Sequence, residues 1–114
     1  MNTTVEEKSF RFAIRIVNLY RFLCREKKEF VLSKQLMRSG TSIGANIAEA
    51  QQAQSRADFV SKMNIALKET AETDYWMRLL HATEYLSDQE FQSVIVDCRE
   101  IGKMLTAIIK SARK

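Results

Sequence analysis

The 114-residue sequence has no proline, only three glycines and a single histidine. Proline breaks helix interiors and glycine weakens them, so their scarcity leaves the long segments free to be helical. Those segments are dominated by Leu, Ala, Lys, Glu, Arg, Gln and Met, which are favourable helix formers. The sequence therefore predicts an all-α fold, and its length suits one domain covering residues 1–114.

Cysteine is also scarce, and no long apolar run is present. Cys24 and Cys98 lie far apart, without a CxxC pair or histidines beside them, which favours two reduced thiols over a disulfide or a metal site. No apolar run approaches the ~18 residues that a membrane-spanning helix needs. The initial stretch, MNTTVEEKSFRF, contains two glutamates and no apolar core, unlike a secretory signal. We therefore expect a cytoplasmic protein without a membrane partner.

Motifs of catalysis are missing as well. Four side chains could be combined into a di-metal carboxylate site, namely Glu49, Glu72, Asp74 and His81. Such sites use Glu-x-x-His pairs on two helices, and no Glu-x-x-His occurs. Ser42 lies outside any nucleophile elbow, and GTSIG at residues 40–44 lacks the lysine and the spacing of a phosphate loop. We expect no enzyme activity, no cofactor, no bound metal and no small-molecule substrate.

Apolar residues recur at helical spacing in four segments, expected at about residues 5–28, 33–53, 56–85 and 87–111. In the first segment the core-facing stripe consists of Phe12, Ile16, Leu19 and Leu23. Caps are expected at the start of the other three, from Ser33, from Ser55 with Asp58, and from Ser87 with Glu90. Four helices with short links fold most simply as an antiparallel up-down-up-down bundle.

The second segment carries an unusual set of small and polar residues. Gly40, Gly44 and Ala48 fall at i, i+4 and i+8, so a helix would present a ridge that a neighbour can approach closely. Each glycine costs up to ~1 kcal/mol of helix propensity, and packing must compensate. Beside the ridge lies a polar row of Gln35, Ser42, Asn46 and Glu49, which borders Ile43 and Ile47 and needs hydrogen-bond partners. Arg38 is one candidate.

The chain has a net charge of +4 and a pI near 9.2, which permits RNA or DNA as a partner. The basic side chains of interest lie opposite the apolar stripe of the first helix, with one more in the second helix: Arg11, Arg15, Arg21, Arg25, Lys28 and Arg38. We expect them to contact phosphates. No RNA-recognition motif is present, so such binding would have little sequence specificity. A solvated face with intrahelical ion pairs is the open alternative.

Some apolar residues fall outside the predicted core. Ile14 and Phe22 lie among the arginines of the first helix. The third helix has a second apolar stripe, formed by Ile65, Trp76, Leu79 and Leu80. A helix that is apolar on two sides in a small domain indicates contacts with other copies of the chain as well as with the core.

The sequence from residue 32 to residue 80 resembles the bacterial four-helix-bundle proteins known as 23S rRNA intervening-sequence proteins. The family's signature and packing residues are Gly40, Ser42, Ile43, Gly44, Asn46, Ile47, Ala48, Glu49, Asp58, Phe59, Glu69, Glu72 and Trp76. The flanking helices are compatible in length and pattern. Ala50 stands where many members have glycine, a difference that we expect to affect only local packing.

The resemblance implies a left-handed antiparallel four-helix bundle that assembles into a ring-like homopentamer and is not an enzyme. A related group serves as accessory proteins to reverse transcriptases and binds nucleic acid through a basic surface. Two functions therefore stay open. One is a homo-oligomeric protein that binds RNA or DNA through its basic surface, and the other is a protein-interaction scaffold or an accessory subunit of a nucleic-acid enzyme such as a reverse transcriptase.

Overall fold

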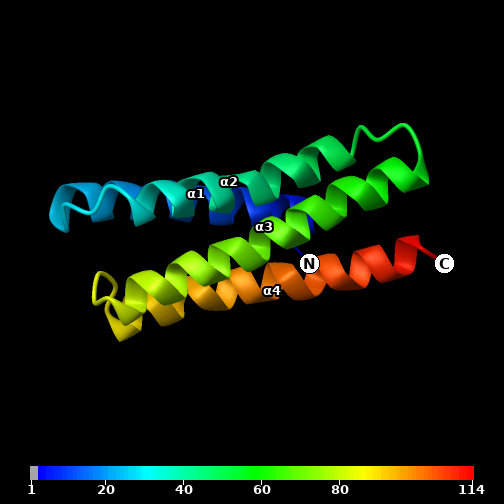
Figure 1. Ribbon diagram of the computed structural model, residues 1–114. Coiled ribbons are helices and arrows are strands. Elements are labelled where there is room, and N and C mark those ends of the chain that lie inside the picture. Colours follow the sequence, from blue (N-terminus) through cyan, green and yellow to red (C-terminus); the bar gives the residue numbers. More distant parts are fainter. Residues whose placement is uncertain (1–2) are drawn as a thin grey trace.

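The computed structural model describes residues 3–114 and contains four α-helices: α1 (Val5–Glu26), α2 (Leu32–Ala50), α3 (Arg56–Ala82) and α4 (Asp88–Ala112). Consecutive helices run in opposite directions, and both described chain ends lie toward the end of the bundle that holds the α2–α3 link (Figure 1). The predicted all-α, up-down-up-down arrangement is confirmed. Residues 1–2 of the predicted domain lie outside the described residues. Within residues 3–114 no helix is both long enough and apolar enough to cross a membrane.

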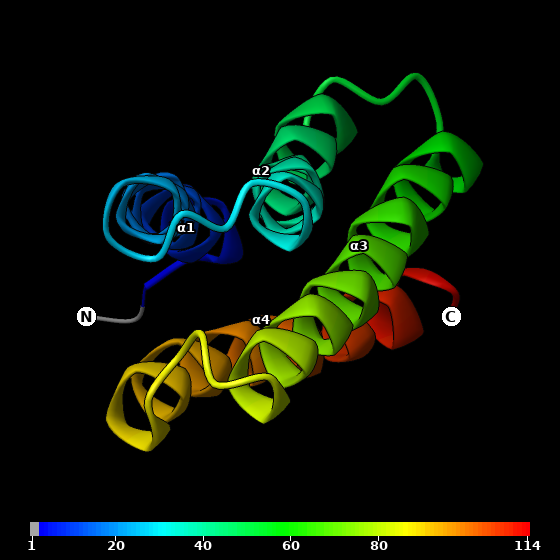
Figure 2. The same ribbon diagram turned by 60° about the vertical axis from the view of Figure 1, so that its left-hand side comes forward.

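The bundle consists of two helical hairpins, α1–α2 and α3–α4, joined through extensive packing of α2 on α3. In Figure 2, α1 and α2 are seen almost end-on while α3 and α4 run obliquely, so the two hairpins are inclined to each other. The α1–α4 contact is the least extensive of the four helix pairs. Within the described chain, α1 does not contact α3.

All four helices contribute to one hydrophobic core. The largest fully buried side chains include Phe12, Ile16 and Leu23 of α1, which confirms the predicted stripe, while Leu19 is only partly buried against it. Burial of such a side chain stabilises the fold by roughly 1.5–3 kcal/mol. Leu80 differs from its prediction, because it lies in the core rather than on a second exposed stripe of α3.

The glycine ridge of α2 faces α1 and permits a close approach. A methyl group at Gly40 would lie 2.8 Å from two carbons of the fully buried Ile16 side chain. One at Gly44 would lie 3.3 Å from the Ser9 carbonyl oxygen. The two glycines therefore fulfil the predicted packing role. Ala48, the third member of the predicted ridge, is exposed.

The predicted helix starts agree with the structure better than the predicted helix ends. α3 and α4 begin where expected: Ser55 Oγ accepts from the Asp58 N–H at 3.0 Å, and Ser87 with Glu90 forms a complete capping box. The predicted ends of the first three helices are two to three residues too late, since α1, α2 and α3 end at Glu26, Ala50 and Ala82, whereas α4 ends at Ala112, one residue beyond its predicted end. Lys28 and Glu84, which follow two of those ends, adopt positive φ of 55° and 68°.

Glu29, rather than Ser33, caps α2. Its carboxylate accepts backbone N–H bonds from Ser33 at 2.6 Å, Leu32 at 3.1 Å and Val31 at 3.2 Å, and Ser33 is already inside the helix. Glu29 is only 8% exposed. Burial raises the pKa of this carboxyl, but the three backbone donors outweigh it and hold the pKa below its usual value. The link between α1 and α2 thus depends on one buried carboxylate.

The packing of α3 on α4 buries a thiol. Cys98 is fully buried, and its Sγ donates to the Thr70 carbonyl oxygen at 3.5 Å. Burial raises the pKa of the Cys98 thiol to about 12, with a smaller contribution from the nearby Asp74 carboxylate. Cys24 is half-buried, and both cysteines are free.

Candidate nucleic-acid interface

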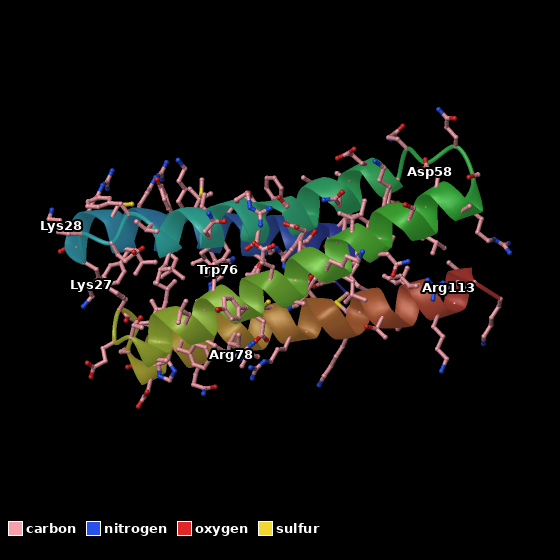
Figure 3. All side chains as sticks on the ribbon, in the orientation of Figure 1. Lys27, Lys28, Asp58, Trp76, Arg78 and Arg113 are labelled. Atoms are coloured by element: carbon pink, nitrogen blue, oxygen red, sulfur yellow. The ribbon has the colours of Figure 1, made fainter. Side chains whose placement is uncertain are left out.

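The outer face of α1 presents basic side chains to solvent. Because Phe12, Ile16 and Leu23 turn one side of α1 into the core, residues on the opposite side are exposed. Four of the predicted phosphate contacts lie there or just beyond the helix end, and all are exposed: Arg11, Arg21, Arg25 and Lys28. In the described part of the chain none of the four forms an ion pair. Figure 3 shows Lys28 at the end of the bundle formed by the α1–α2 link.

Arg15 does not lie with these residues as the sequence predicted. Its guanidinium turns toward α4, where Nη1 donates to Asp97 Oδ2 at 2.6 Å and to the Ser93 carbonyl oxygen at 3.0 Å. Nη2 donates to Ser93 Oγ at 2.6 Å. Lys8 supplies a further ion pair across the same seam, to Glu100 at 3.1 Å. The charge of Arg15 is thus compensated within the bundle and helps to hold α1 against α4.

Arg38 is likewise paired inside the protein. It reaches from α2 to α3, where Nη1 donates to Glu69 Oε2 at 3.2 Å and Nη2 donates to the Glu72 carboxylate. Trp76 Nε1 donates to Glu72 Oε2 at 2.9 Å. The hydrogen bonds from Trp76 and then Arg38 hold the pKa of Glu72 below its usual value, despite some burial. The structure therefore gathers Arg38 and three signature residues into one α2–α3 network.

The remaining signature residues serve packing and local hydrogen bonding. Ser42 Oγ donates to the Arg38 carbonyl oxygen at 2.6 Å, and Asn46 Nδ2 donates to the Ser42 carbonyl oxygen at 2.9 Å. Two members of the polar row predicted to need partners, Ser42 and Asn46, thus find them in their own helix. The other signature residues have these places: Ile43 and Ile47 in the core, Phe59 partly buried against it, Glu49 paired with Lys62, and Asp58 at the α3 N-terminus.

The four residues considered for a metal site each have a different partner. Glu49 pairs with Lys62 at 3.5 Å, and His81 Nε2 lies 2.6 Å from Asp88 Oδ1. Glu72 belongs to the Arg38 network, and Asp74 pairs with arginines of α3 and α4. Among residues 3–114 no three His, Cys, Asp or Glu side chains come together in a way that could hold a metal ion.

Sequence reasoning missed a second basic cluster, which lies along the seam between α3 and α4. A groove there is lined by four basic side chains, Arg78 of α3 and Arg99, Lys103 and Lys110 of α4, together with Asp74. Arg78 extends on the α4 side of α3 (Figure 3). The three α4 residues fall at i, i+4 and i+11, a spacing visible in the sequence. Arg78 joins them only through the packing of α3 on α4.

The exposed apolar residues of α1 also differ in part from the prediction. Phe10 is 68% exposed and Ile14 is 49% exposed, whereas Phe22 packs against the core and is only partly buried. Phe10 lies between two shallow hollows. The larger one, at the α1–α2 seam, is lined mainly by small residues, including Ala13, Ala45 and Ala48. Apolar surface and basic charge thus occur side by side on α1.

Comparisons with known proteins identify the family. Residues 1–107 match the family described as 23S rRNA-intervening sequence protein. Among solved structures, the chain is 62% identical to a protein of unknown function from the S23 ribosomal protein family of Bacteroides thetaiotaomicron. That match covers 94% of this chain and 99% of the other, with a TM-score of 0.93. No curated protein matches the chain. The chain therefore belongs to the 23S rRNA-intervening sequence protein family.

Proposed function

We propose that this protein is a non-enzymatic homo-oligomer that binds RNA or DNA without sequence specificity through the outer face of α1. The observation that carries the proposal is a set of four exposed basic side chains on that face or just beyond its end, which form no ion pair within residues 3–114: Arg11, Arg21, Arg25 and Lys28. Two further predicted contacts, Arg15 and Arg38, have their charge compensated by carboxylates within the bundle, so they are not part of the proposed face.

The chemistry of the proposed contact is phosphate neutralisation. Arginine and lysine side chains that bind phosphate oxygens displace condensed counterions, so binding weakens steeply as salt rises. Such contacts carry no base information, which accounts for the absence of sequence specificity in the proposal. The net charge of +4 is modest for one chain, and assembly of several copies would multiply the number of phosphates contacted.

Homo-oligomeric assembly, with the five copies that the family resemblance implies, belongs to the proposal. The exposed Phe10 and Ile14 support it, because large apolar side chains grouped on a surface favour burial against another copy. The cytoplasmic location stays a prediction.

The proposal is tested by fluorescence anisotropy with a labelled structured RNA and a labelled DNA duplex, at 50 and 200 mM salt. Arg21→Glu/Arg25→Glu is compared with a control of equal charge change, Lys34→Glu/Lys68→Glu, whose lysines are exposed on α2 and α3. The α1 variant is expected to lose affinity far more than the control while both keep the wild-type oligomer mass. Equal affinity of the two variants, or no wild-type binding at 50 mM salt, would overturn the proposal.

The alternative, a protein-interaction scaffold or an accessory subunit of a nucleic-acid enzyme such as a reverse transcriptase, is favoured by the same exposed Phe10 and Ile14. An apolar surface beside a hollow fits a protein partner at least as well as it fits a nucleic acid. The two functions separate with Phe10→Asp. A scaffold is expected to lose its protein partner in Phe10→Asp and to keep that partner in Arg21→Glu/Arg25→Glu. Loss of assembly alone does not distinguish the two functions, because both place Phe10 between copies.

A further inference from the structure

The groove between α3 and α4 has basic side chains along its rim and small side chains on its floor. Its rim carries Arg78, Arg99, Lys103 and Lys110, all exposed. Its only acidic lining residue is Asp74, so the formal charge of the lining residues is strongly positive. The floor includes the small residues Ala71 and Ala107. A long, thin anion could therefore lie along the groove without meeting a large side chain.

Asp74 orients the two arginines of the rim. Arg78 Nε donates to Asp74 Oδ1 at 2.8 Å, and Arg99 Nε donates to Asp74 Oδ2 at 2.9 Å. Each guanidinium thus uses one nitrogen, and its two Nη groups form no other hydrogen bond in the part of the chain that is described. A guanidinium fixed in this way loses less conformational entropy when it binds a phosphate. Asp74 is a positioning residue in this arrangement, and its single negative charge compensates only one of the two guanidinium charges.

The basic residues of α4 form a row along one side of the groove. Arg99 and Lys110 are eleven positions apart in a continuous helix, which corresponds to about 16 Å at the ~1.5 Å rise per residue. Phosphates of one duplex strand rise about 3.4 Å each along the axis while the strand winds around it, so a straight row of this length meets only a few of them. Lys103 lies between the two ends, and neither lysine has an acidic partner within residues 3–114.

We propose that the α3–α4 groove is a second nucleic-acid surface, which binds the sugar-phosphate backbone of one strand and is separate from the α1 face. That the ligand is a nucleic acid rests on the proposed function, whereas the position of this second surface rests on the basic residues that line the groove. The two surfaces belong to different hairpins, which are inclined to each other (Figure 2): the groove lies on the α3–α4 hairpin, and the exposed basic side chains of α1 lie opposite its core-facing residues. One copy of the chain thus offers phosphate contacts in two directions.

The test uses anisotropy of a labelled duplex and a labelled single strand across 50–200 mM salt, with the full-length oligomer. Lys103→Glu/Lys110→Glu is compared with the α1 variant Arg21→Glu/Arg25→Glu and with the equal-charge control Lys34→Glu/Lys68→Glu. Two lost duplex phosphate contacts lower the salt slope by about 2, which reduces the loss of affinity between 50 and 200 mM by about tenfold. We expect the groove variant to show that change and the control not to show it.

A second variant removes the groove without changing charge. Ala71→Gln/Ala107→Gln places two long side chains on the floor, and Ala57→Gln/Ala82→Gln is the control at exposed alanines of α3 outside the groove. The floor variant is expected to weaken binding severalfold relative to its control, with unchanged helical content and oligomer mass.

The outcomes separate this inference from the proposed function. If the α1 variant loses binding while both groove variants match their controls, the inference is overturned and the α1 proposal stands. If the groove variants lose binding and the α1 variant does not, the inference stands and the α1 proposal is overturned. A fall in oligomer mass in the groove variants would show that the groove lies between copies and would also overturn the inference. No wild-type binding at 50 mM salt overturns both.

Discussion

Gly40 and Gly102 are helical glycines whose surroundings differ. A methyl group at Gly40 would lie 2.8 Å from the buried Ile16 side chain, whereas one at Gly102 would lie 3.4 Å from the Thr70 methyl, an ordinary contact. Replacing glycine by alanine in a helix gains up to ~1 kcal/mol of propensity, and overpacking a core costs about 1–3 kcal/mol. We expect Gly40→Ala to lower the free energy of unfolding by about 1–2 kcal/mol and Gly102→Ala to raise it by about 0.5–1 kcal/mol.

Urea unfolding followed by Trp76 fluorescence measures both changes, since the chain has one tryptophan and it lies at the α2–α3 seam. Gly102→Ala is the matched control, because both substitutions add one methyl group to a helix. A Gly40→Ala protein as stable as the wild type would mean that α1 moves away from α2 at little cost, and that the close approach does not contribute to stability.

At the scale of the helix and its cap, Glu29 is the residue that sequence reasoning missed. Its two oxygens accept three backbone N–H bonds at the start of α2, and hydrogen bonds to a charged group contribute about 1.5–3 kcal/mol each before compensation. Glu29→Gln replaces one acceptor oxygen by a donor. We expect it to lower the free energy of unfolding by about 1–2 kcal/mol, a fall in Tm of about 4–8 °C by calorimetry.

Glu26→Gln is the control for Glu29, because Glu26 is an exposed glutamate three residues earlier that makes no capping bond in the described chain. Its Tm is expected to stay within about 2 °C of the wild type, in line with the ±0.5 kcal/mol typical of surface substitutions. An equal fall in Tm for both variants would show that local charge, rather than the cap, stabilises the link.

Helix starts could be predicted from the sequence more accurately than helix ends, for a physical reason. Ser55 and Ser87 lie directly before apolar periodicity, and their side chains satisfy backbone donors locally. The ends carry no such mark, because the residues that take positive φ there are Lys28 and Glu84 rather than glycine. The Glu29 cap has no usual sequence signal. Glu29 lies three residues before the first residue of α2, and its carboxylate reaches the backbone N–H groups at the helix start only because of the conformation of the α1–α2 link.

At the scale of the molecule, three carboxylates couple stability to pH. Hydrogen bonds and ion pairs hold the pKa values of Glu29, Glu72 and Asp74 below their usual values, in each case against some burial. A lowered folded pKa contributes stability that is present above the unfolded pKa, about 4, and is lost as pH falls through the folded pKa. We expect the urea midpoint to be constant from pH 7 to about 5 and to fall below that.

The Glu29→Gln protein provides the comparison for this pH dependence. It lacks one of the three titrating groups, so its midpoint is expected to fall less between pH 5 and pH 3 than that of the wild type. Parallel curves for the two proteins would show that Glu29 does not titrate with folding. The fold itself should remain the same, because Gln keeps the size and polarity of the side chain.

The fold was predictable from the sequence to a greater degree than the candidate interface, because apolar periodicity is local whereas charge pairing is not. The spacing of Arg15 and Arg38 matches that of an exposed basic row, and their partners Asp97, Glu69 and Glu72 come from helices distant in sequence. The α3–α4 groove was missed for the converse reason, since its rim forms only when two helices pack.

The buried Cys98 thiol makes the opening of the α3–α4 hairpin measurable by chemical labelling. A thiol with a pKa of about 12 and no exposed surface reacts with an alkylating reagent only during moments when the hairpin opens. Cys24 is half-buried on α1 and reacts from the folded state, so it serves as the internal reference for reagent quality. The alkylation rate of Cys98 therefore measures how often the floor beneath Asp74 and the groove rim comes apart, in the intact oligomer and at any salt concentration.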